Sequence, residues 1–385
     1  MTFGFTTEQK LLRESVRKLM DTHAPPDYVR RKDRERAYPY ELYDEWVKAG
    51  LLGVAFPEKY GGAGGNVVDL AICAEQIAYT SADFQMCYGG VVFCGMNLLH
   101  KGSEEQKAYW LPKLANGERR MSISMSEPEA GSDVGAIRTR AEPAKSGGGW
   151  IVNGQKLWNT AAGARDNTMS VYLKTDTSVH YRKGMSLFLI DNDAPGVKLN
   201  KLEMLGRHCA GTYEVFLSDV KVGDDRVVGG INKGWECVLA GLQVERIVSA
   251  AGNCGAAQGV VDMAAAYAKE RKQFGRPIGT NQAIAHMLAD MQTEVAAAKA
   301  LLWQAAGKAA AGEEALEDIT MAKLFSSETY VKVANMGMQI MGGYGYSLEF
   351  DMQRHYRDCR SSTVAAGSSQ IQRNLIAGLM GLKVQ

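Results

Sequence analysis

The chain has 385 residues, of which 46% are hydrophobic and 23% are charged. This balance is typical of a globular protein and excludes collagen-like and disordered chains, while the length predicts two or three packed units. Lys and Arg total 44 against 43 Asp and Glu, a formal net charge of +1, so no broad electrostatic field for nucleic acid or anionic lipid is expected.

The seven cysteines are widely spaced and contain no C-x-x-C pair, which favours neither a disulfide framework nor a zinc ribbon. A reducing, cytoplasmic setting is the simplest expectation. The first 20 residues are charged throughout and predict an amphipathic helix, with Thr6 and Gln9 as a capping box, rather than a targeting peptide. No apolar run approaches the roughly 18 residues that span a bilayer, so membrane insertion is not expected.

Three regions follow one another along the chain. Residues 1–118 show helical periodicity and predict an N-terminal all-α domain. Residues 119–227 predict a middle β domain, with a hairpin turn at Asn153-Gly154 between apolar stretches. Further β-like runs occupy 168–174, 185–190 and 212–222.

Residues 228–385 return to a helical period and predict a C-terminal four-helix bundle, which makes the whole chain an α+β protein. The four long Ala-, Leu- and Met-rich stretches are 233–270, 281–312, 315–342 and 366–382. Small residues at three- and four-residue spacing on the first of them indicate close approach of a neighbouring helix. They are Gly252, Gly255, Ala256 and Gly259.

Generic catalytic motifs give no signal. Walker A, G-x-G-x-x-G, H-E-x-x-H and G-x-S-x-G patterns are absent, which disfavours P-loop nucleotide binding, zinc proteolysis and an α/β-hydrolase elbow. The histidines His100, His208 and His286 have no partners at metal-ligand spacing, so no metal site is expected.

Glu245 stands out on local grounds. On a helix over 233–270 its face is apolar or small, with Gly241 one turn before it and Ser249 one turn after. Such a face raises the pKa of a carboxyl and suits a general base. The alternatives are an ion pair with Arg246 or Lys269, or a partly solvated side chain at a helix seam.

Five segments carry a resemblance to a known family. They are MSEPEAGSDVGAI (125–137), KLWNT (156–160), RKQFGRPIG (271–279), QIMGGYGYSLEFDMQRHYRD (339–358) and AGSSQIQRNLIAG (366–378). The chain resembles the acyl-CoA dehydrogenase family over essentially its whole length. The resemblance implies the same three-domain order, with a β-barrel-like middle domain, and FAD between that domain and the bundle.

The resemblance assigns cofactor residues in the middle domain. Ser126 is implied to place its hydroxyl near the isoalloxazine, and Ser132 to lie by the cofactor and the CoA moiety. Trp158 and Thr160 match residues that shield the flavin and bind at N5, although Asn159 stands between them where Ile is usual.

A second set of cofactor residues is implied in the C-terminal region. Its members are Arg271, Phe274, Gln282, Gln339, Gly342, Gly343, Ser368 and Gln370. An arginine and paired glycines suit a diphosphate, which needs a cation and close backbone approach. In the family the groups at 339–343 reach the cofactor of a neighbouring subunit, which implies a dimer, usually doubled to a homotetramer.

The chain departs from the family at the usual catalytic base. The position before the G-S-S-Q-I run, which is Glu in many members, is Ala366 here. A subgroup that includes isovaleryl-CoA dehydrogenase carries the base in an E-R dipeptide on a bundle helix, which matches Glu245 and Arg246. Arg246 is then implied to support substrate binding, and the backbone N–H of Ala366 to meet the thioester oxygen.

The leading hypothesis is an FAD-dependent dehydrogenase of a short, branched or unusual acyl-CoA, with electron-transferring flavoprotein as acceptor. The same arrangement also resembles enoyl-CoA reductases of the crotonobetainyl type and acyl-CoA desulfinases. A third hypothesis is a weakly catalytic binding protein, because one branch of the superfamily resembles a DNA-binding protein with a basic C-terminal extension. Such an extension does not follow residue 382 in this sequence. Residues 85–95 and Tyr344 are expected at the acyl end, with ordinary helix contacts as the alternative.

Overall fold

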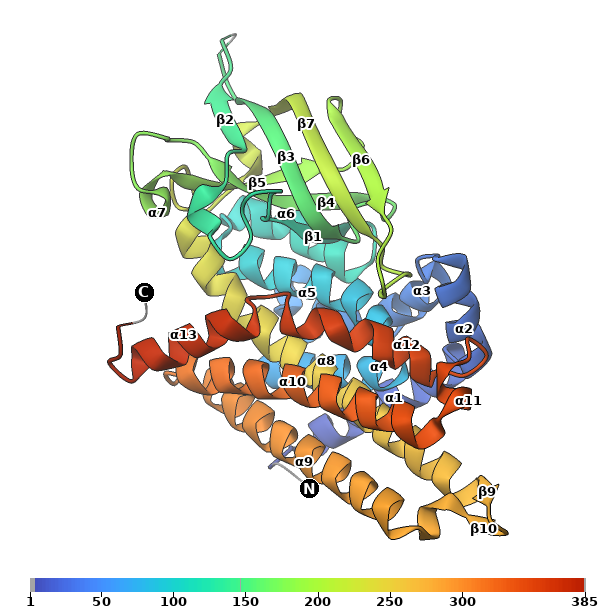
Figure 1. The fold of residues 1–385 in the computed structure, drawn as a ribbon. Helices are drawn as coiled ribbons and strands as arrows, with labels where there is room; N and C mark the ends of the chain where they lie inside the picture. Colours follow the sequence, from blue (N-terminus) through green and yellow to red (C-terminus); the bar gives the residue numbers. More distant parts are fainter. Residues whose placement is uncertain (1–3, 146, 384–385) are drawn as a thin grey trace.

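The computed structural model describes residues 4–145 and 147–383. Two helical regions, one N-terminal and one C-terminal, lie below a twisted β-sheet (Figure 1). The N-terminal helices are α1 (Thr7–His23), α2 (Pro26–Glu35), α3 (Tyr40–Lys48), α4 (Val67–Thr80), α5 (Ala82–Lys101) and α6 (Glu104–Ala115). The predicted capping box is confirmed, since the Thr6 hydroxyl accepts from the Gln9 N–H and the Gln9 side chain accepts from the Thr6 N–H.

In the described part of the chain, eight strands form one sheet in the order β6-β7-β3-β2-β4-β5-β8, with β1 paired to β4. The strands are β1 (Arg120–Ser124), β2 (Arg140–Pro143), β3 (Trp150–Thr160), β4 (Asn167–Lys174), β5 (Met185–Asp191), β6 (Val197–Leu202), β7 (Thr212–Val222) and β8 (Val227–Val228). A short helix, α7 (Tyr181–Gly184), precedes β5. The apolar sides of the strands enclose a separate core that includes Val152, Met169 and Phe188.

The predicted hairpin turn at Asn153-Gly154 is wrong. Both residues lie inside the continuous strand β3, and the chain instead reverses between β2 and β3. Gly154 sits at a register shift against β7, at a φ of 153°, and a Cβ there would lie 2.4 Å from the Thr139 hydroxyl oxygen. The glycine therefore serves a bulge and a close approach rather than a turn.

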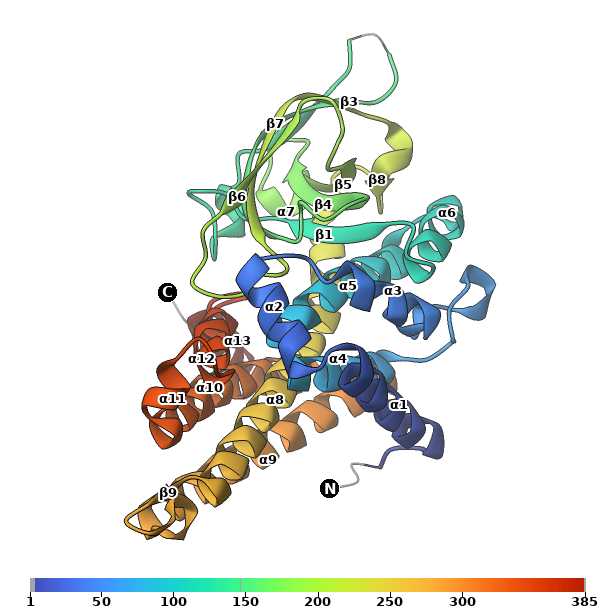
Figure 2. The same ribbon diagram turned by 90° about the vertical axis from the view of Figure 1, so that its right-hand side faces the viewer.

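The C-terminal region is built around one long helix, α8 (Gly234–Glu270), which runs from beneath the sheet to the far tip of the molecule (Figure 2). The other elements are β9 (Lys272–Gln273), β10 (Arg276–Pro277), α9 (Gln282–Ala310), α10 (Leu316–Met341), α11 (Gly343–Tyr346), α12 (Met352–Cys359) and α13 (Ser369–Leu379). The four predicted long helices correspond to α8, α9, α10 and α13, while α12 was not predicted as a separate helix. Its eight residues are mostly polar yet largely buried, which hides the helical hydrophobic pattern.

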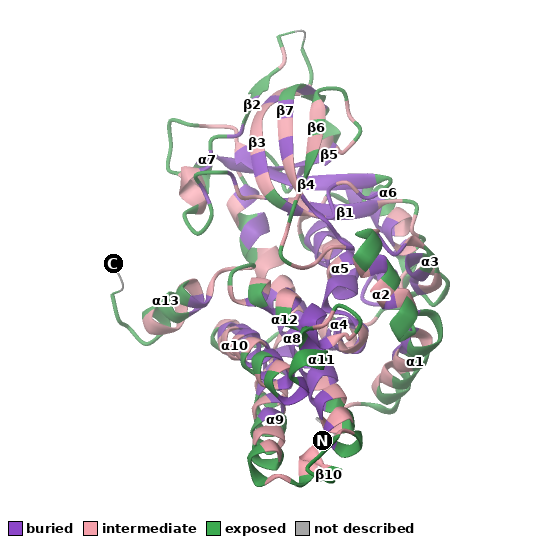
Figure 3. Cartoon of the chain, turned by 45° about the vertical axis from the view of Figure 1, so that its right-hand side comes forward, coloured by how far each residue is buried: buried purple, intermediate pink, exposed green. Residues whose placement is uncertain are grey.

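Close packing against α8 follows from its glycines. A Cβ on Gly255 would lie 2.0 Å from the Glu75 carbonyl oxygen of α4, and one on Gly259 would lie 2.5 Å from that of Tyr79. The small-residue stripe thus admits a neighbouring backbone, as predicted. Figure 3 shows the resulting band of buried residues along α4, α5 and α8, with exposed residues at the β9–β10 tip.

The predicted domain boundaries fall between α6 and β1 and inside β8. As limits of independent folding units they stay predictions. Among the residues that the structure describes, no helix is both long and apolar enough to cross a bilayer.

Candidate active site

A small cavity opens between α5, α8 and the strands β1 and β4. The lining residues are Phe93, Cys94, Asn97, Ile123, Met125, Ser170, Tyr172, Val238, Gly241, Leu242 and Glu245. The predicted base therefore lies in a cavity that three parts of the chain enclose.

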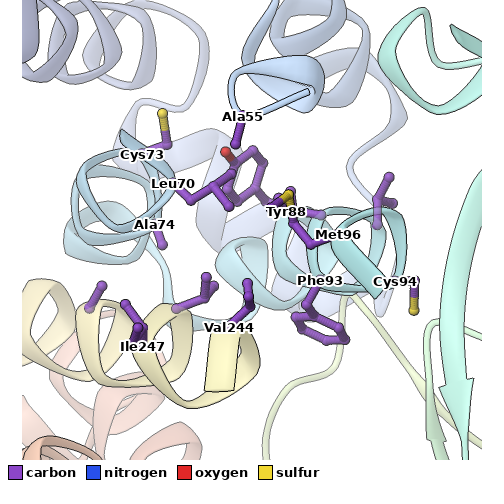
Figure 4. Packing of buried hydrophobic residues seen from close by; sticks show 14 of the residues in the cluster. Ala55, Leu70, Cys73, Ala74, Tyr88, Phe93, Cys94, Met96, Val244 and Ile247 are labelled. Carbon is purple, nitrogen blue, oxygen red and sulfur yellow. The ribbon is translucent and has the colours of Figure 1, made fainter. Parts of the chain in front are cut away.

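Glycines bring α5 and α8 together at this cavity. A Cβ on Gly241 would lie 3.1 Å from the Asn97 amide nitrogen, and one on Gly89 would lie 3.7 Å from a Val248 methyl. The two helices thus run antiparallel, with α5 residues 89–97 facing α8 residues 241–248. Figure 4 shows Phe93 pointing from α5 toward α8, close to Val244, while Cys94 points toward the strands.

The environment of Glu245 suits proton transfer. Its side chain is half-buried, and within the described residues its carboxylate has no hydrogen bond and no ion pair within 4 Å, so the predicted alternative of an ion pair with Arg246 or Lys269 does not form. Burial raises the pKa of Glu245 to about 6, although the charges of Arg246 and Lys323 pull that pKa down. A carboxyl near that value is ionised at neutral pH and readily accepts a proton.

A second group of charges lies next to Glu245, at the turn that carries Ala366. Lys323 Nζ donates to the carbonyl oxygens of Gly367 (2.6 Å) and Ser362 (3.1 Å), and burial lowers its pKa to about 8. Arg246 is 6% exposed, and its Nε has no partner among the described residues. Sequence reasoning missed Lys323, because one lysine on an amphipathic helix carries no local signal of a distant partner.

The turn that contains Ala366 has a left-handed backbone conformation. Ala366 has a φ of 55° and Gly367 a φ of 83°, both in the left-handed region. The Gln372 side chain donates to both of their carbonyl oxygens, at 3.3 and 3.1 Å, while the Ala366 N–H has no acceptor in the described chain. Ser368 caps α13 by accepting from the Ile371 N–H, and Gln370 is exposed.

On the sheet side, Trp158 is 55% exposed at a φ of 62°, within the second register shift of β3, between Lys156 and Asn159. The Leu157 N–H donates to the Ser126 carbonyl at 2.8 Å, so the first signature loop is fixed beside Trp158. Thr160 is half-buried, and Asn159 keeps a buried Oδ1 without a partner in the described part of the chain. Ser132 is exposed in the same loop as Ser126.

These features fit a planar, polar-edged cofactor such as FAD. An exposed aromatic ring at a strained bulge, such as Trp158, commonly marks a binding site. The buried Oδ1 of Asn159 also needs a hydrogen-bond donor. Trp158 and Thr160 lie at the C-terminal end of β3, where the Leu157 N–H binds the Ser126 carbonyl.

The remaining predicted cofactor residues lie at the opposite end of α8. Arg271 follows the last turn of α8, about 39 Å along the helix axis from Glu245. Its guanidinium lies 5.2 Å from the ring centroid of Tyr344, which follows the exposed Gly342 and Gly343. Phe274 is fully exposed at the β9–β10 tip. Gln282 begins α9 beside this tip and is also exposed.

This placement corrects one expectation. Tyr344 was expected at the acyl end of the site, but it does not line the cavity that contains Glu245. It packs with Tyr267 and Phe350 beside Arg271, at the far end of α8. In residues 85–95, Phe93 and Cys94 line the cavity. Among the described residues, no group of three or more His, Cys, Asp and Glu side chains is arranged to hold a metal ion.

Comparison with known proteins decides the family. The chain matches the models of the N-terminal domain (residues 6–118), middle domain (122–220) and C-terminal domain (232–380) of acyl-CoA dehydrogenase. It is 35% identical to the Caffeyl-CoA reductase-Etf complex subunit CarC of Acetobacterium woodii, over 98% of this chain and 99% of that one. The chain belongs to the acyl-CoA dehydrogenase family.

Two other relatives support the assignment to this family of FAD-dependent oxidoreductases. The glutaryl-CoA dehydrogenase of Desulfococcus multivorans is 37% identical over 98% of this chain and 97% of its own. The structure of butyryl-CoA dehydrogenase from Megasphaera elsdenii superposes with a TM-score of 0.93 at 30% identity, covering 98% of each chain. The acyl-CoA dehydrogenase resemblance and the predicted α+β fold class are confirmed.

Proposed function

We propose that this member of the family removes the α-proton of a short acyl-CoA thioester with Glu245 and forms the α,β-enoyl thioester. The observation that carries the proposal is the position of Glu245 in the cavity between α5, α8 and the sheet, without an ion pair in the described chain and with a pKa raised to about 6. Ala366 cannot act as the base, since its side chain is a methyl group.

The residues around the cavity suit the charge that this reaction creates. Removal of an α-proton places negative charge on the thioester oxygen, which oriented donors must stabilise. The N–H of Ala366 is free to donate, and the buried guanidinium of Arg246 lies at the same turn, since a Cβ on Gly367 would be 3.8 Å from it. Bound FAD supplies the acceptor for the β-hydride.

We infer that FAD is held by residues of two copies of the chain. Ser126, Ser132, Trp158 and Thr160 of one copy face the flavin ring. Arg271, Phe274, Gln282, Gln339, Gly342 and Gly343 of another copy hold the rest of the cofactor, because they lie too far from Glu245 to act in the same chain. Ser368 and Gln370, at the start of α13, complete the proposed set next to Ala366. The dimer, doubled to a homotetramer, is part of this proposal.

Reduction is the second candidate reaction. It is favoured by the relationship to the Caffeyl-CoA reductase-Etf complex subunit, because the same carboxyl can return a proton to an enoyl thioester. That name also supports electron-transferring flavoprotein as the electron partner. A cytoplasmic location stays a proposal.

The test uses holoenzyme with full FAD occupancy, mixed anaerobically with a panel of saturated acyl-CoAs. Bleaching of the flavin absorbance by a short acyl-CoA is expected, and no bleaching by any of them contradicts the dehydrogenase proposal. Bleaching with dithionite followed by reoxidation with enoyl-CoAs tests the reductase direction. Exchange of the α-proton in D₂O, lost in Glu245→Gln, tests the assigned base in both directions.

A further inference from the structure

The inner end of the acyl cavity is polar. Asn97 and Tyr172 line it, are only 6% and 2% exposed, and come from α5 and β4. The Asn97 amide nitrogen donates to the Tyr172 hydroxyl at 2.8 Å. A polar pair is not expected in a pocket that binds a plain alkyl chain, because burying polar groups costs free energy unless they are hydrogen-bonded.

The hydrogen bonds of this pair are incomplete. Asn97 Oδ1 is buried and has no partner within the described residues, although an amide oxygen can accept two hydrogen bonds. The Tyr172 hydroxyl accepts from Asn97 and has no recorded acceptor for its own proton in the described chain. If the amide group is rotated by 180°, Tyr172 donates to the oxygen and the amide nitrogen is left unpaired instead. In both orientations the pair keeps at least one unused donor and one unused acceptor at the cavity wall.

The pair lies at a fixed depth from the proposed base. Gly241, against whose missing side chain Asn97 packs, precedes Glu245 by four residues of α8, about 6 Å of helix rise. Cys94, which also lines the cavity, has a small side chain. An acyl group whose α-carbon lies at Glu245 therefore brings its third or fourth further atom to Asn97 and Tyr172.

No cationic side chain of the described residues lines the cavity. Of its eleven lining residues only Glu245 is charged, and it is negative. A carboxylate at the end of the acyl group would lie near that charge without a counter-ion, which is strongly unfavourable in a buried site. A methyl group there would leave the Asn97 Oδ1 and the Tyr172 hydroxyl proton without partners. A hydroxyl group donates and accepts at once and satisfies both.

We propose that the acyl group of the substrate carries a hydroxyl at its far end, held by Asn97 and Tyr172. This inference rests on the proposed acyl-CoA chemistry of the cavity and names the class of acyl group. Gly241 contributes to the same recognition, because a side chain at that position would displace the Asn97 amide from the ligand. Asn97 and Tyr172 are specificity residues and take no part in proton transfer.

The test compares matched thioesters in which the terminal hydroxyl is replaced by a methyl group. The pairs are 4-hydroxybutyryl-CoA with pentanoyl-CoA and 5-hydroxypentanoyl-CoA with hexanoyl-CoA. The wild-type holoenzyme is expected to favour the hydroxylated member of at least one pair by about 10-fold or more in kcat/KM, since an unmet buried polar group costs about 1–3 kcal/mol. Glutaryl-CoA is expected to be the poorest substrate of its length.

Variants locate the preference. Asn97→Leu and Tyr172→Phe are expected to abolish or reverse it, each while raising the relative kcat/KM for the methyl-ended thioester. Asn200→Leu, at an exposed position on strand β6, is the control and is expected to leave the preference unchanged. If one cavity variant does not fold, the other still decides, because each removes one member of the pair.

A binding measurement separates this inference from the proposed reaction. Dissociation constants of the same pairs, measured by calorimetry on Glu245→Gln holoenzyme, report recognition without turnover. Tighter binding of the hydroxylated member by about 10-fold supports the inference even if no thioester is oxidised. Equal affinities for both members of every pair, or a preference that survives Asn97→Leu and Tyr172→Phe, overturn it.

Discussion

Lys156 Nζ donates to Glu127 Oε1 at 2.8 Å, and both side chains are buried, at 0% and 7% exposure. Lys156 also donates to the Met125 carbonyl, and Glu127 accepts from the backbone N–H groups of Arg138 and Thr139. The pair thus ties strand β3 to the loop 125–139, immediately beside Trp158. It fixes the position of the loop that is proposed to face the flavin.

Replacing Lys156 with Met is expected to lower the free energy of unfolding by about 3–5 kcal/mol, because Glu127 is left as a buried charge without its counter-ion. Urea denaturation followed by far-UV circular dichroism measures this loss, and the FAD content of the purified variant is expected to fall with it. Lys59→Met is the matched control. Its partner Glu104 is 66% exposed and Lys59 64% exposed, so a change of at most about 1 kcal/mol is expected. Equal losses in both variants would contradict the structural role of the buried pair.

Glu245→Gln is expected to lower kcat by about 10²–10⁴-fold while FAD remains bound, since a positioned base contributes that factor. In the wild type, kcat/KM is expected to fall tenfold per pH unit below pH 6, because protonation of Glu245, whose pKa is raised to about 6, removes the base. Stopped-flow reduction across pH 5–8 measures both effects. Glu236→Gln, at an exposed position on α8, serves as the control. A profile without this acidic limb argues against Glu245.

The same carboxyl links stability to pH. Its pKa rises from 4.5 in the unfolded chain to about 6 in the folded protein, so the folded state binds the proton more tightly. This tighter proton binding stabilises the folded state by about 2 kcal/mol below pH 4.5. The stabilisation is lost as the pH rises through 6. Glu245→Gln is therefore expected to be more stable than wild type by about 2 kcal/mol at pH 8 and nearly equal to it at pH 4.5. Denaturant midpoints at the two pH values test this, and a difference independent of pH would exclude the titration as its cause.

Gly255→Ala and Gly307→Ala are expected to change stability in opposite directions, although both glycines lie inside long helices. The new methyl at 255 meets the Glu75 carbonyl oxygen at 2.0 Å and forces α4 away from α8, which destabilises the protein by about 1–3 kcal/mol. At 307 nothing lies within 4 Å, so the higher helix propensity of Ala stabilises the protein by about 1 kcal/mol. Thermal unfolding of the two variants measures the contrast, and a loss of stability at 307 would show that contact with another copy limits that position.

Phe274→Ser is expected to lower FAD occupancy and to shift the sedimentation coefficient toward a smaller species. Phe274 is fully exposed in the single chain, so its loss cannot disturb the packing within one copy. Leu205→Ser, another exposed apolar residue at 66%, is the control surface change. Unchanged sedimentation and cofactor content in Phe274→Ser would exclude the tip of α8 from the proposed subunit contact.

The sequence determined the family and much of the fold, because these follow from local patterns. The helical period of 234–270, the small residues that face α4 and the five ordered segments are all readable along the chain. Glu245 was predicted as the base in the same way, through its small and apolar helix face and the missing carboxylate at Ala366, and its role stays a proposal. The hairpin at Asn153-Gly154 failed because the strongest turn signal cannot reveal that Thr139 lies against Gly154.

Only the tertiary structure decided which distant residues share a site. Lys323, whose charge lowers the pKa of Glu245, donates to the Gly367 carbonyl, and Asn97 donates to Tyr172 at the cavity that Glu245 lines. Tyr344 was expected at that cavity and lies at the other end of α8. Side chains far apart in sequence are brought together by helix and strand packing, and neither periodicity nor motif spacing encodes which polar atoms remain unpaired once that packing is complete.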